Sequence, residues 1–285
     1  MQNEPSSSTG ITKLNVANLV AYILNVVITY VIGASNLFSL PTNAELSEKY
    51  QTIVTPAGWA FAIWGIIFIS QLVWVVYQTA VPSQRSSPFV SAVAYNYVWV
   101  CVAQIGWTLC FTFEVIFPSV VCMLGILLFL ARIVFALNDQ FSIKDYILWK
   151  FPFTLHCGWI IAASIVNINV MLVYLELSAI VLFYSAIGSL VALLAVAMSF
   201  LAKDSVVVVP VIWALFGVQS ELKAPKESIT AVFSAQWIDY ARYGAIGVAS
   251  LLSVFLVVKV VRSFRASRNK ESTSPDEGTY LRHNE

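Results

Sequence analysis

The sequence predicts an all-α fold, a polytopic bundle of about eight transmembrane helices. Of its 285 residues, 59% are hydrophobic and 11% are charged, whereas a soluble domain carries roughly 25% charged residues. So few charges cannot coat a soluble body of this size, but they suffice for short loops between membrane spans. Eight apolar runs follow one another along the chain, at residues 14–38, 57–81, 93–117, 118–138, 151–175, 177–201, 205–218 and 241–261.

Seven of these runs reach the roughly 20 residues that a helix needs to span a bilayer. The exception is 205–218, which contains Pro210 and follows Lys203 and Asp204. This segment fits three structures: a re-entrant segment, a kinked span that continues towards Leu222, or a packed helix.

Basic residues favour eight spans with both termini in the cytoplasm, because Lys and Arg are enriched in cytoplasmic loops. An eight-span topology places Lys13, Arg85, Lys144, Lys150, Lys203, Lys259, Arg262, Arg265, Arg268 and Lys270 inside, and Lys49, Lys223, Lys226 and Arg242 outside. Seven spans would leave most loop charges outside. The last five inner residues form a juxtamembrane cluster that we expect to face anionic lipid. The sequence has no other basic cluster, so nucleic acid is not a predicted partner.

The chain divides into four predicted regions. Residues 1–13 form a polar N-terminal tail, and residues 14–175 contain the first five helices. Residues 176–264 hold the additional transmembrane helices. Residues 265–285 are rich in Ser, Lys, Glu and Asn, a composition typical of a disordered tail.

Three of the predicted helices carry rings and amides along one face. In the second helix this face holds Phe61, Trp64, Phe68 and Gln71, with Trp59 close by. The corresponding residues are Tyr97, Gln104, Trp107, Phe111 and Glu114 in the third helix, and His156, Trp159, Ala163, Asn167 and Tyr174 in the fifth.

A polar side chain in hydrocarbon is costly unless it faces the interior of the bundle, so we expect Gln104, His156, Asn167 and Arg132 to point inward. Together, the three faces are typical of a pocket for a flat, mostly apolar molecule that a few polar groups orient. The alternative is structural, because amides and histidines also bond helices together and tryptophans anchor helix ends at the membrane interface.

Signatures of enzymes are absent from the sequence. It contains two histidines, one of them His283 in the tail, and it lacks HExxH, GxSxG, Walker and GxGxxG motifs. Glu114, Asp139 and Glu176 lie near predicted helix ends and are not spaced as metal ligands. We therefore assign no catalytic residue and no metal site.

Residues of the second helix resemble the signature of the TspO/translocator protein family, also called tryptophan-rich sensory proteins. That signature is Pro-Pro-x-Trp-x-Phe followed by a further Trp and a Tyr. Pro56, Trp59, Phe61, Trp64 and Phe68 are similar to it. Ala57 replaces the second proline, Phe68 replaces the Tyr, and the spacing between the tryptophans is shorter by one residue.

Two further helices extend the resemblance. Gln104-Ile105-Gly106-Trp107 is similar to a family Asn-x-x-Trp pattern in the third helix, and Trp159, Ala162, Ala163 and Asn167 are similar to the fifth. The resemblance covers roughly residues 14–173. The helices that follow indicate a longer, divergent member of the family.

The resemblance implies a five-helix bundle that binds or transports porphyrins (tetrapyrroles) or sterol-like molecules, with a sensory or stress role and no certain cofactor. The predicted partners are the lipid bilayer and a lipophilic small molecule; a homo-oligomer stays open. Two alternatives remain: a membrane enzyme that degrades such a ligand, and a scaffold or sensor subunit that binds proteins. The predicted ligand-binding residues are Trp59, Phe61, Trp64, Phe68, Gln104, Trp107, His156, Trp159 and Asn167.

Overall fold

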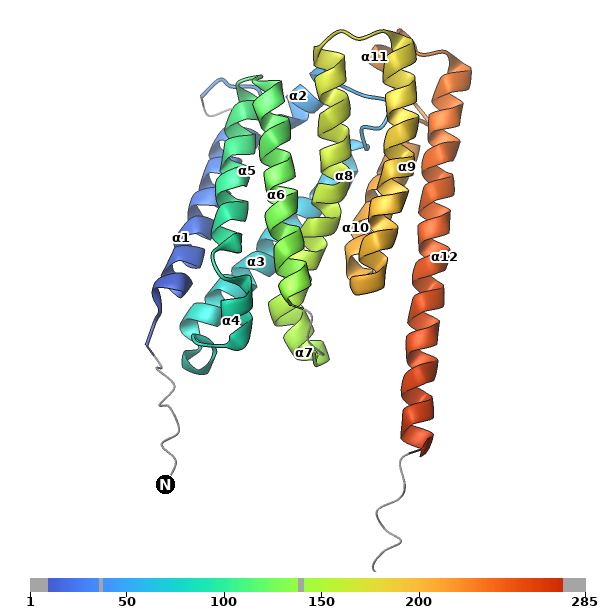
Figure 1. The fold of residues 1–285 in the computed structure, drawn as a ribbon. Coiled ribbons are helices and arrows are strands. Elements are labelled where there is room, and N and C mark those ends of the chain that lie inside the picture. The colour runs from blue at the N-terminus through green and yellow to red at the C-terminus, as the bar shows by residue number, and fades with distance from the viewer. Residues whose placement is uncertain (1–9, 36–37, 138–140, 274–285) are drawn as a thin grey trace, which may run out of the picture.

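The fold is a bundle of long helices with short connections (Figure 1). It is seen in a computed structural model that describes residues 10–35, 38–137 and 141–273, without the side chains of residues 264 and 266–273. The main helices are α1 (Lys13–Ile28), α3 (Ile63–Ala80), α5 (Asn96–Thr112), α6 (Ile116–Ala136), α8 (Phe151–Tyr174), α9 (Ala179–Lys203), α10 (Val208–Glu221) and α12 (Ala235–Thr273). The short helices are α2 (Asn43–Lys49), α4 (Pro88–Val93), α7 (Ile143–Asp145) and α11 (Glu227–Thr230). Short π-helices are η1 (Thr29–Ala34) and η4 (Tyr146–Lys150). Short 3-10 helices are η2 (Gly58–Ala62), η3 (Pro82–Gln84) and η5 (Ser205–Val207).

Within the described residues, six helices are long and apolar enough to cross a membrane. They cover Lys13–Ala34, Gly58–Ala80, Ile116–Ala136, Ile143–Tyr174, Ala179–Lys203 and Ala235–Ser263. The predicted all-helical, multi-pass bundle is thereby confirmed. α12 continues to Thr273, into the predicted tail 265–285, and residues 1–9 of the N-terminal tail lie outside the described residues.

The third apolar run is shorter as a helix than its hydropathy predicts. Residues 93–117 do not form one helix, because α4 ends at Val93 and α5 covers only 17 residues. Ala94 and Glu114, on either side of α5, have φ angles of 49° and 58°. A positive φ is incompatible with a right-handed helix, so both positions terminate it.

The short run at 205–218 is a helix that crosses the bundle. η5 and α10 together form a 17-residue apolar helix, Ser205–Glu221. We call the end of the bundle where α4 and α7 lie the α4 end, and the opposite end, with α2 and α11, the α2 end. In Figure 1 this helix runs from the α4 end towards the α2 end. Pro210 lies in the first turn of α10, where proline costs no hydrogen bond. A re-entrant segment is therefore wrong for this run.

Five helices close into a ring, and three others stand beside it. α1 packs against α3 and α5, α5 against α6, α6 against α8, and α8 against α3. This five-helix ring is joined by an annex of α9, α10 and α12, which contact one another while α9 and α10 contact α8. In Figure 1 the annex lies to the right of α8.

An irregular segment lies between the ring and the annex. Residues 51–57 are buried and non-helical, a state of the backbone that a membrane tolerates only inside protein. The Ala57 N–H donates to the carbonyl of Gly217 at 3.0 Å, and the Trp213 indole donates to the carbonyl of Ala60 at 2.9 Å. The annex thus supplies hydrogen-bond partners for the start of the second span.

A buried ion pair connects the two parts at the α4 end. Lys150 Nζ lies 3.2 Å from Asp204 Oδ2, and these side chains are only 7% and 5% exposed. The Tyr146 hydroxyl donates to the other carboxylate oxygen of Asp204 at 2.9 Å. Lys150 precedes α8 of the ring, and Asp204 joins α9 to α10 of the annex.

Candidate functional site

Five predicted site residues form an aromatic cluster between α3 and α8. η2 and α3 supply Phe61, Trp64 and Phe68, and α8 supplies His156 and Trp159. Trp64 stacks on Phe68 at 5.5 Å between ring centroids, and its edge contacts are His156 at 5.5 Å and Trp159 at 6.2 Å. Phe61 meets Trp159 edge to face at 5.6 Å. The structure therefore brings these five rings together.

A chain of hydrogen bonds fixes the protonation of His156. The Gln71 amide nitrogen lies 2.9 Å from His156 Nδ1, while the Gln71 amide oxygen accepts from the Tyr97 hydroxyl at 3.2 Å. With the Gln71 amide in this orientation, its nitrogen donates to Nδ1, and the proton of the neutral ring sits on Nε2. Gln71 thereby turns His156 Nε2 into a donor.

Two donors in the cluster have no partner within the described part of the chain. They are His156 Nε2 and Trp159 Nε1, on side chains that are 0% and 2% exposed. Residues three apart on a helix share a face. The two side chains therefore lie on one face of α8, where both rings contact Trp64 of α3.

The cluster reaches the outer surface of the ring. His156 and Trp159 are buried, Trp64 is half-buried and Phe61 is exposed. In a membrane an exposed aromatic ring on a spanning helix contacts lipid. A molecule dissolved in the bilayer thus meets Phe61 and Trp64 before it reaches the two donors.

Trp59 belongs to a different contact. It is 45% exposed and packs edge to face on Trp213 of α10, at 4.8 Å between centroids. Its indole donates to the Ser220 hydroxyl at 3.3 Å. Trp59 thus joins η2 to the annex, and no feature of its own run in the sequence indicates Trp213 as the partner.

Trp107 and Asn167 form a second, separate group. The Trp107 indole donates to Asn167 Oδ1 at 2.6 Å, Asn167 Nδ2 donates to Ser119 Oγ at 3.1 Å, and Trp107 stacks on Phe111 at 5.2 Å. Asn167 lies eight residues beyond Trp159, or about 12 Å along α8. Because these polar groups satisfy one another, the group ties α5, α6 and α8 together.

Gln104 and Arg132 lie apart from both groups. Gln104 is 1% exposed and points into the ring, with neither amide atom hydrogen-bonded. Arg132 is exposed on the surface of α6, so the expectation that it points inward is wrong. It lies one turn before α6 ends at Ala136, close enough for a long basic side chain to reach the membrane surface. Glu114, just beyond the end of α5, pairs with Lys49.

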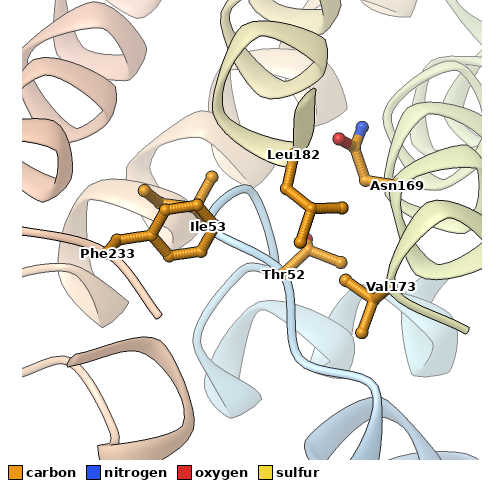
Figure 2. Close-up of a pocket in the computed structure, with 6 residues that line it drawn as sticks. All are labelled: Thr52, Ile53, Asn169, Val173, Leu182 and Phe233. Carbon is orange, nitrogen blue, oxygen red and sulfur yellow. The ribbon is translucent and has the colours of Figure 1, made fainter. Parts of the chain in front are cut away.

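A small cavity lies elsewhere, below the irregular segment. It measures about 10 Å³, room for about one water molecule, whereas ligand pockets span roughly 300–1,000 Å³. Figure 2 shows its lining residues, which include none of the predicted site residues: Thr52, Ile53, Asn169, Val173, Leu182 and Phe233.

The described residues contain no group of three His, Cys, Asp or Glu side chains that could hold a metal ion. The Cys101, Cys110, Cys122 and Cys157 thiols are free. The polar chemistry of the aromatic cluster thus consists of neutral hydrogen-bonding groups.

Comparison with known proteins assigns the family. Residues 15–265 match a family model described as TSPO-like protein, while no curated protein and no solved structure matches the chain. The match extends beyond the first five helices and includes α9, α10 and most of α12. This integral membrane chain, ring and annex alike, belongs to the TSPO-like protein family.

Proposed function

We propose that the protein binds a lipophilic small molecule inside the membrane, at the aromatic cluster of α3 and α8. The observation that carries this proposal is the pair of unpaired donors, His156 Nε2 and Trp159 Nε1, beside Trp64. Membership of the TSPO-like family supports binding of lipophilic ligands in general. The aromatic cluster is the site that we assign to such a ligand.

The two donors restrict the chemistry of the ligand. Each buried donor without a partner costs about 1–3 kcal/mol, which a ligand oxygen placed between them would recover. The surrounding rings favour a flat apolar body, since edge-to-face aromatic pairs add about 0.5–1.5 kcal/mol beyond area burial. The proposed ligand is therefore a tetrapyrrole- or sterol-like molecule that carries a hydrogen-bond acceptor.

Substitutions that remove one donor at a time test this site. Protein in nanodiscs is titrated with protoporphyrin IX, and binding is followed by the shift of the porphyrin absorption band. Trp159→Phe and His156→Leu should each weaken binding several-fold to about tenfold, the loss of roughly one hydrogen bond. Trp99→Phe is the matched control, because Trp99 is exposed on α5 outside the cluster.

Unchanged affinity in both cluster variants would refute this site. Competition by cholesterol would show whether a sterol shares it. We also infer that the protein is not an enzyme, which the binding and transport character of the family supports. Recovery of chemically altered porphyrin from the complex, tested by chromatography, would contradict that inference and favour a degrading enzyme.

We infer that both tails face the cytoplasm. The first residues of α1 and the last residues of α12 lie on opposite sides of the molecule but at the same end, the α4 end (Figure 1), as an even number of crossings requires. Lys13, Arg85, Lys144 and Lys203 flank helices at that end, and basic residues are enriched on the cytoplasmic side. In sealed vesicles of known orientation, an impermeant maleimide should label Lys49→Cys and Ser83→Cys from opposite sides. Labelling from the same side would contradict this topology.

A further inference from the structure

α1 turns its polar side inward. Asn15, Asn18, Tyr22, Asn25 and Thr29 follow one another at alternating spacings of three and four residues, so they share one face. The first four are at most 7% exposed. The opposite face of α1 is apolar and exposed, with Val16, Val20, Ile23, Leu24 and Val27. The interior of the five-helix ring is thus lined by amides and hydroxyls along this helix.

α5 and α3 continue this lining on the other side. On α5 the buried face holds Tyr97, Gln104, Thr108 and Thr112, and α3 adds Gln71 and Gln78. Both helices pack against α1. We call these eleven side chains the polar column: Asn15, Asn18, Tyr22, Asn25, Thr29, Gln71, Gln78, Tyr97, Gln104, Thr108 and Thr112.

The polar column reaches the α4 end of the ring. Asn15 Nδ2 lies 3.3 Å from Gln78 Oε1 and 3.2 Å from the backbone oxygen of Arg85, in the connection between α3 and α4. Asn18 Nδ2 also donates to Gln78 Oε1, at 3.4 Å. The amides at this end therefore bond mainly to one another.

Towards the α2 end the column is only partly bonded. Thr29 Oγ1 donates to Asn25 Oδ1 at 3.3 Å and lies 3.4 Å from Thr108 Oγ1. From Asn15 to Thr29 the column follows α1 for about 21 Å, most of the roughly 30 Å of a hydrocarbon core. Along α1 it thus covers about two thirds of that thickness.

Five buried polar atoms of the column have no hydrogen-bond partner within the described residues. They are Asn18 Oδ1, Asn25 Nδ2, Gln104 Nε2, Gln104 Oε1 and Thr112 Oγ1. This set contains both donors and acceptors. Water serves both kinds of group, and buried waters typically satisfy polar atoms of this sort.

The column is also uncharged. Its eleven side chains include no Asp, Glu, Lys or Arg, and Arg85 contributes a backbone oxygen to Asn15. A desolvated ion would find no counter-charge along it, and the cost of burying an unpaired charge is high. The chemistry of the column therefore fits neutral molecules that donate and accept hydrogen bonds.

We propose that the polar column is hydrated and lets water and small neutral hydrogen-bonding solutes pass along the five-helix ring. The path runs from the Arg85 connection, past Tyr22 and Gln104, to Thr112. It is distinct from the proposed lipophilic site, which reaches the outer surface between α3 and α8, although Gln71 belongs to the column and also bonds His156 of that site. Purely structural bonding between helices would leave fewer of these atoms unpaired.

Osmotic shrinkage of proteoliposomes tests the proposal. Vesicles are mixed with impermeant sucrose in a stopped-flow instrument, and light scattering reports water efflux; a glycerol gradient tests a small solute. Wild-type protein should shrink vesicles faster than protein-free lipid does. Asn25→Leu and Gln104→Leu should return the rate to that of protein-free vesicles.

Asn169→Leu is the matched control, because Asn169 is a buried amide outside the column that donates to Ser189 Oγ at 2.8 Å. It should keep the wild-type rate. Thr112→Val guards against misfolding, since it removes one unpaired hydroxyl at nearly constant volume, and it should slow water efflux. A wild-type rate equal to that of protein-free vesicles, or equal rates in wild type and all column variants, would overturn the proposal, as would potassium leak.

Discussion

His156 shows how one neighbour sets the chemistry of an intramembrane residue. Its Nδ1 accepts from Gln71, so the proton of the neutral imidazole is held on Nε2. Trp159, one turn further along α8, also offers an N–H. Both groups are hydrogen-bond donors, so the ligand that we propose for this site must offer an acceptor oxygen.

Gly158, between these two residues in sequence, permits the close packing of the ring on the annex. A Cβ at this position would lie 2.1 Å from the Val207 carbonyl oxygen and 3.0 Å from Pro210 Cδ. Gly158→Ala should therefore destabilise the protein by about 1–3 kcal/mol, as overpacking does. The readout is the thermal midpoint in detergent.

Gly188→Ala provides the comparison for that change. A Cβ at Gly188 of α9 meets nothing within 4 Å, and alanine favours a helix by about 1 kcal/mol over glycine. Its midpoint should equal or exceed that of the wild type. Equal midpoints for the two variants would show that Gly158 is not a tight contact.

An ion pair between Glu114 and Lys49 holds the turn between α5 and α6 in place. Glu114 accepts hydrogen bonds from Lys49 and from the Tyr50 hydroxyl, which ties the turn to the end of α2. These bonds lower the pKa of Glu114 below its ordinary value of 4.5, the bond from Lys49 contributing most. They also raise the pKa of Lys49, again mainly through its bond to Glu114.

The pH dependence of this tie follows from the lowered pKa. The carboxylate contributes stability that is fully present above its ordinary pKa and is lost as pH falls through the lowered value. Glu114→Gln should therefore lower the thermal midpoint slightly at pH 7, and the difference from wild type should shrink as the medium is acidified well below pH 4.5. A difference that stays constant over this range would contradict the role of the ion pair.

Hydropathy predicts most of the helices because a membrane requires long apolar segments, and apolar character is what hydropathy measures. It fails at the ends of α5, where Ala94 and Glu114 adopt positive φ although neither is glycine. It also hides the polar face of α1, because a run average ignores periodicity. The alternating spacing of Asn15, Asn18, Tyr22 and Asn25 was readable in the sequence and would have revealed that face.

At the scale of the molecule, the sequence predicts contacts within a helix better than contacts between helices. His156 and Trp159 share a face of α8 by spacing alone, as do Trp64 and Phe68 on α3. The contact of Trp59 with α10 and the hydrogen bond from Trp107 to Asn167 depend on how helices pack against one another. The periodicity of a single helix does not encode that packing. The role of these residues in ligand binding stays a prediction.

The two parts of the molecule also differ in what they contribute. The ring carries the aromatic cluster and the polar column, while the annex bonds the irregular segment through Trp213 and Gly217. Lys259 of α12 adds a further tie, since its ammonium group donates to the carbonyls of Leu201 and Ala202 at the end of α9. The family match covers both parts.

The buried pair of Lys150 and Asp204 imposes an order on biosynthesis. Lys150 precedes Asp204 by 54 residues in the sequence, so the ammonium group at the start of the last ring helix is synthesised before its counterion in the annex. Leaving one member of a buried pair alone costs about 3–5 kcal/mol. The packing around Lys150 is therefore complete only when the annex is in place.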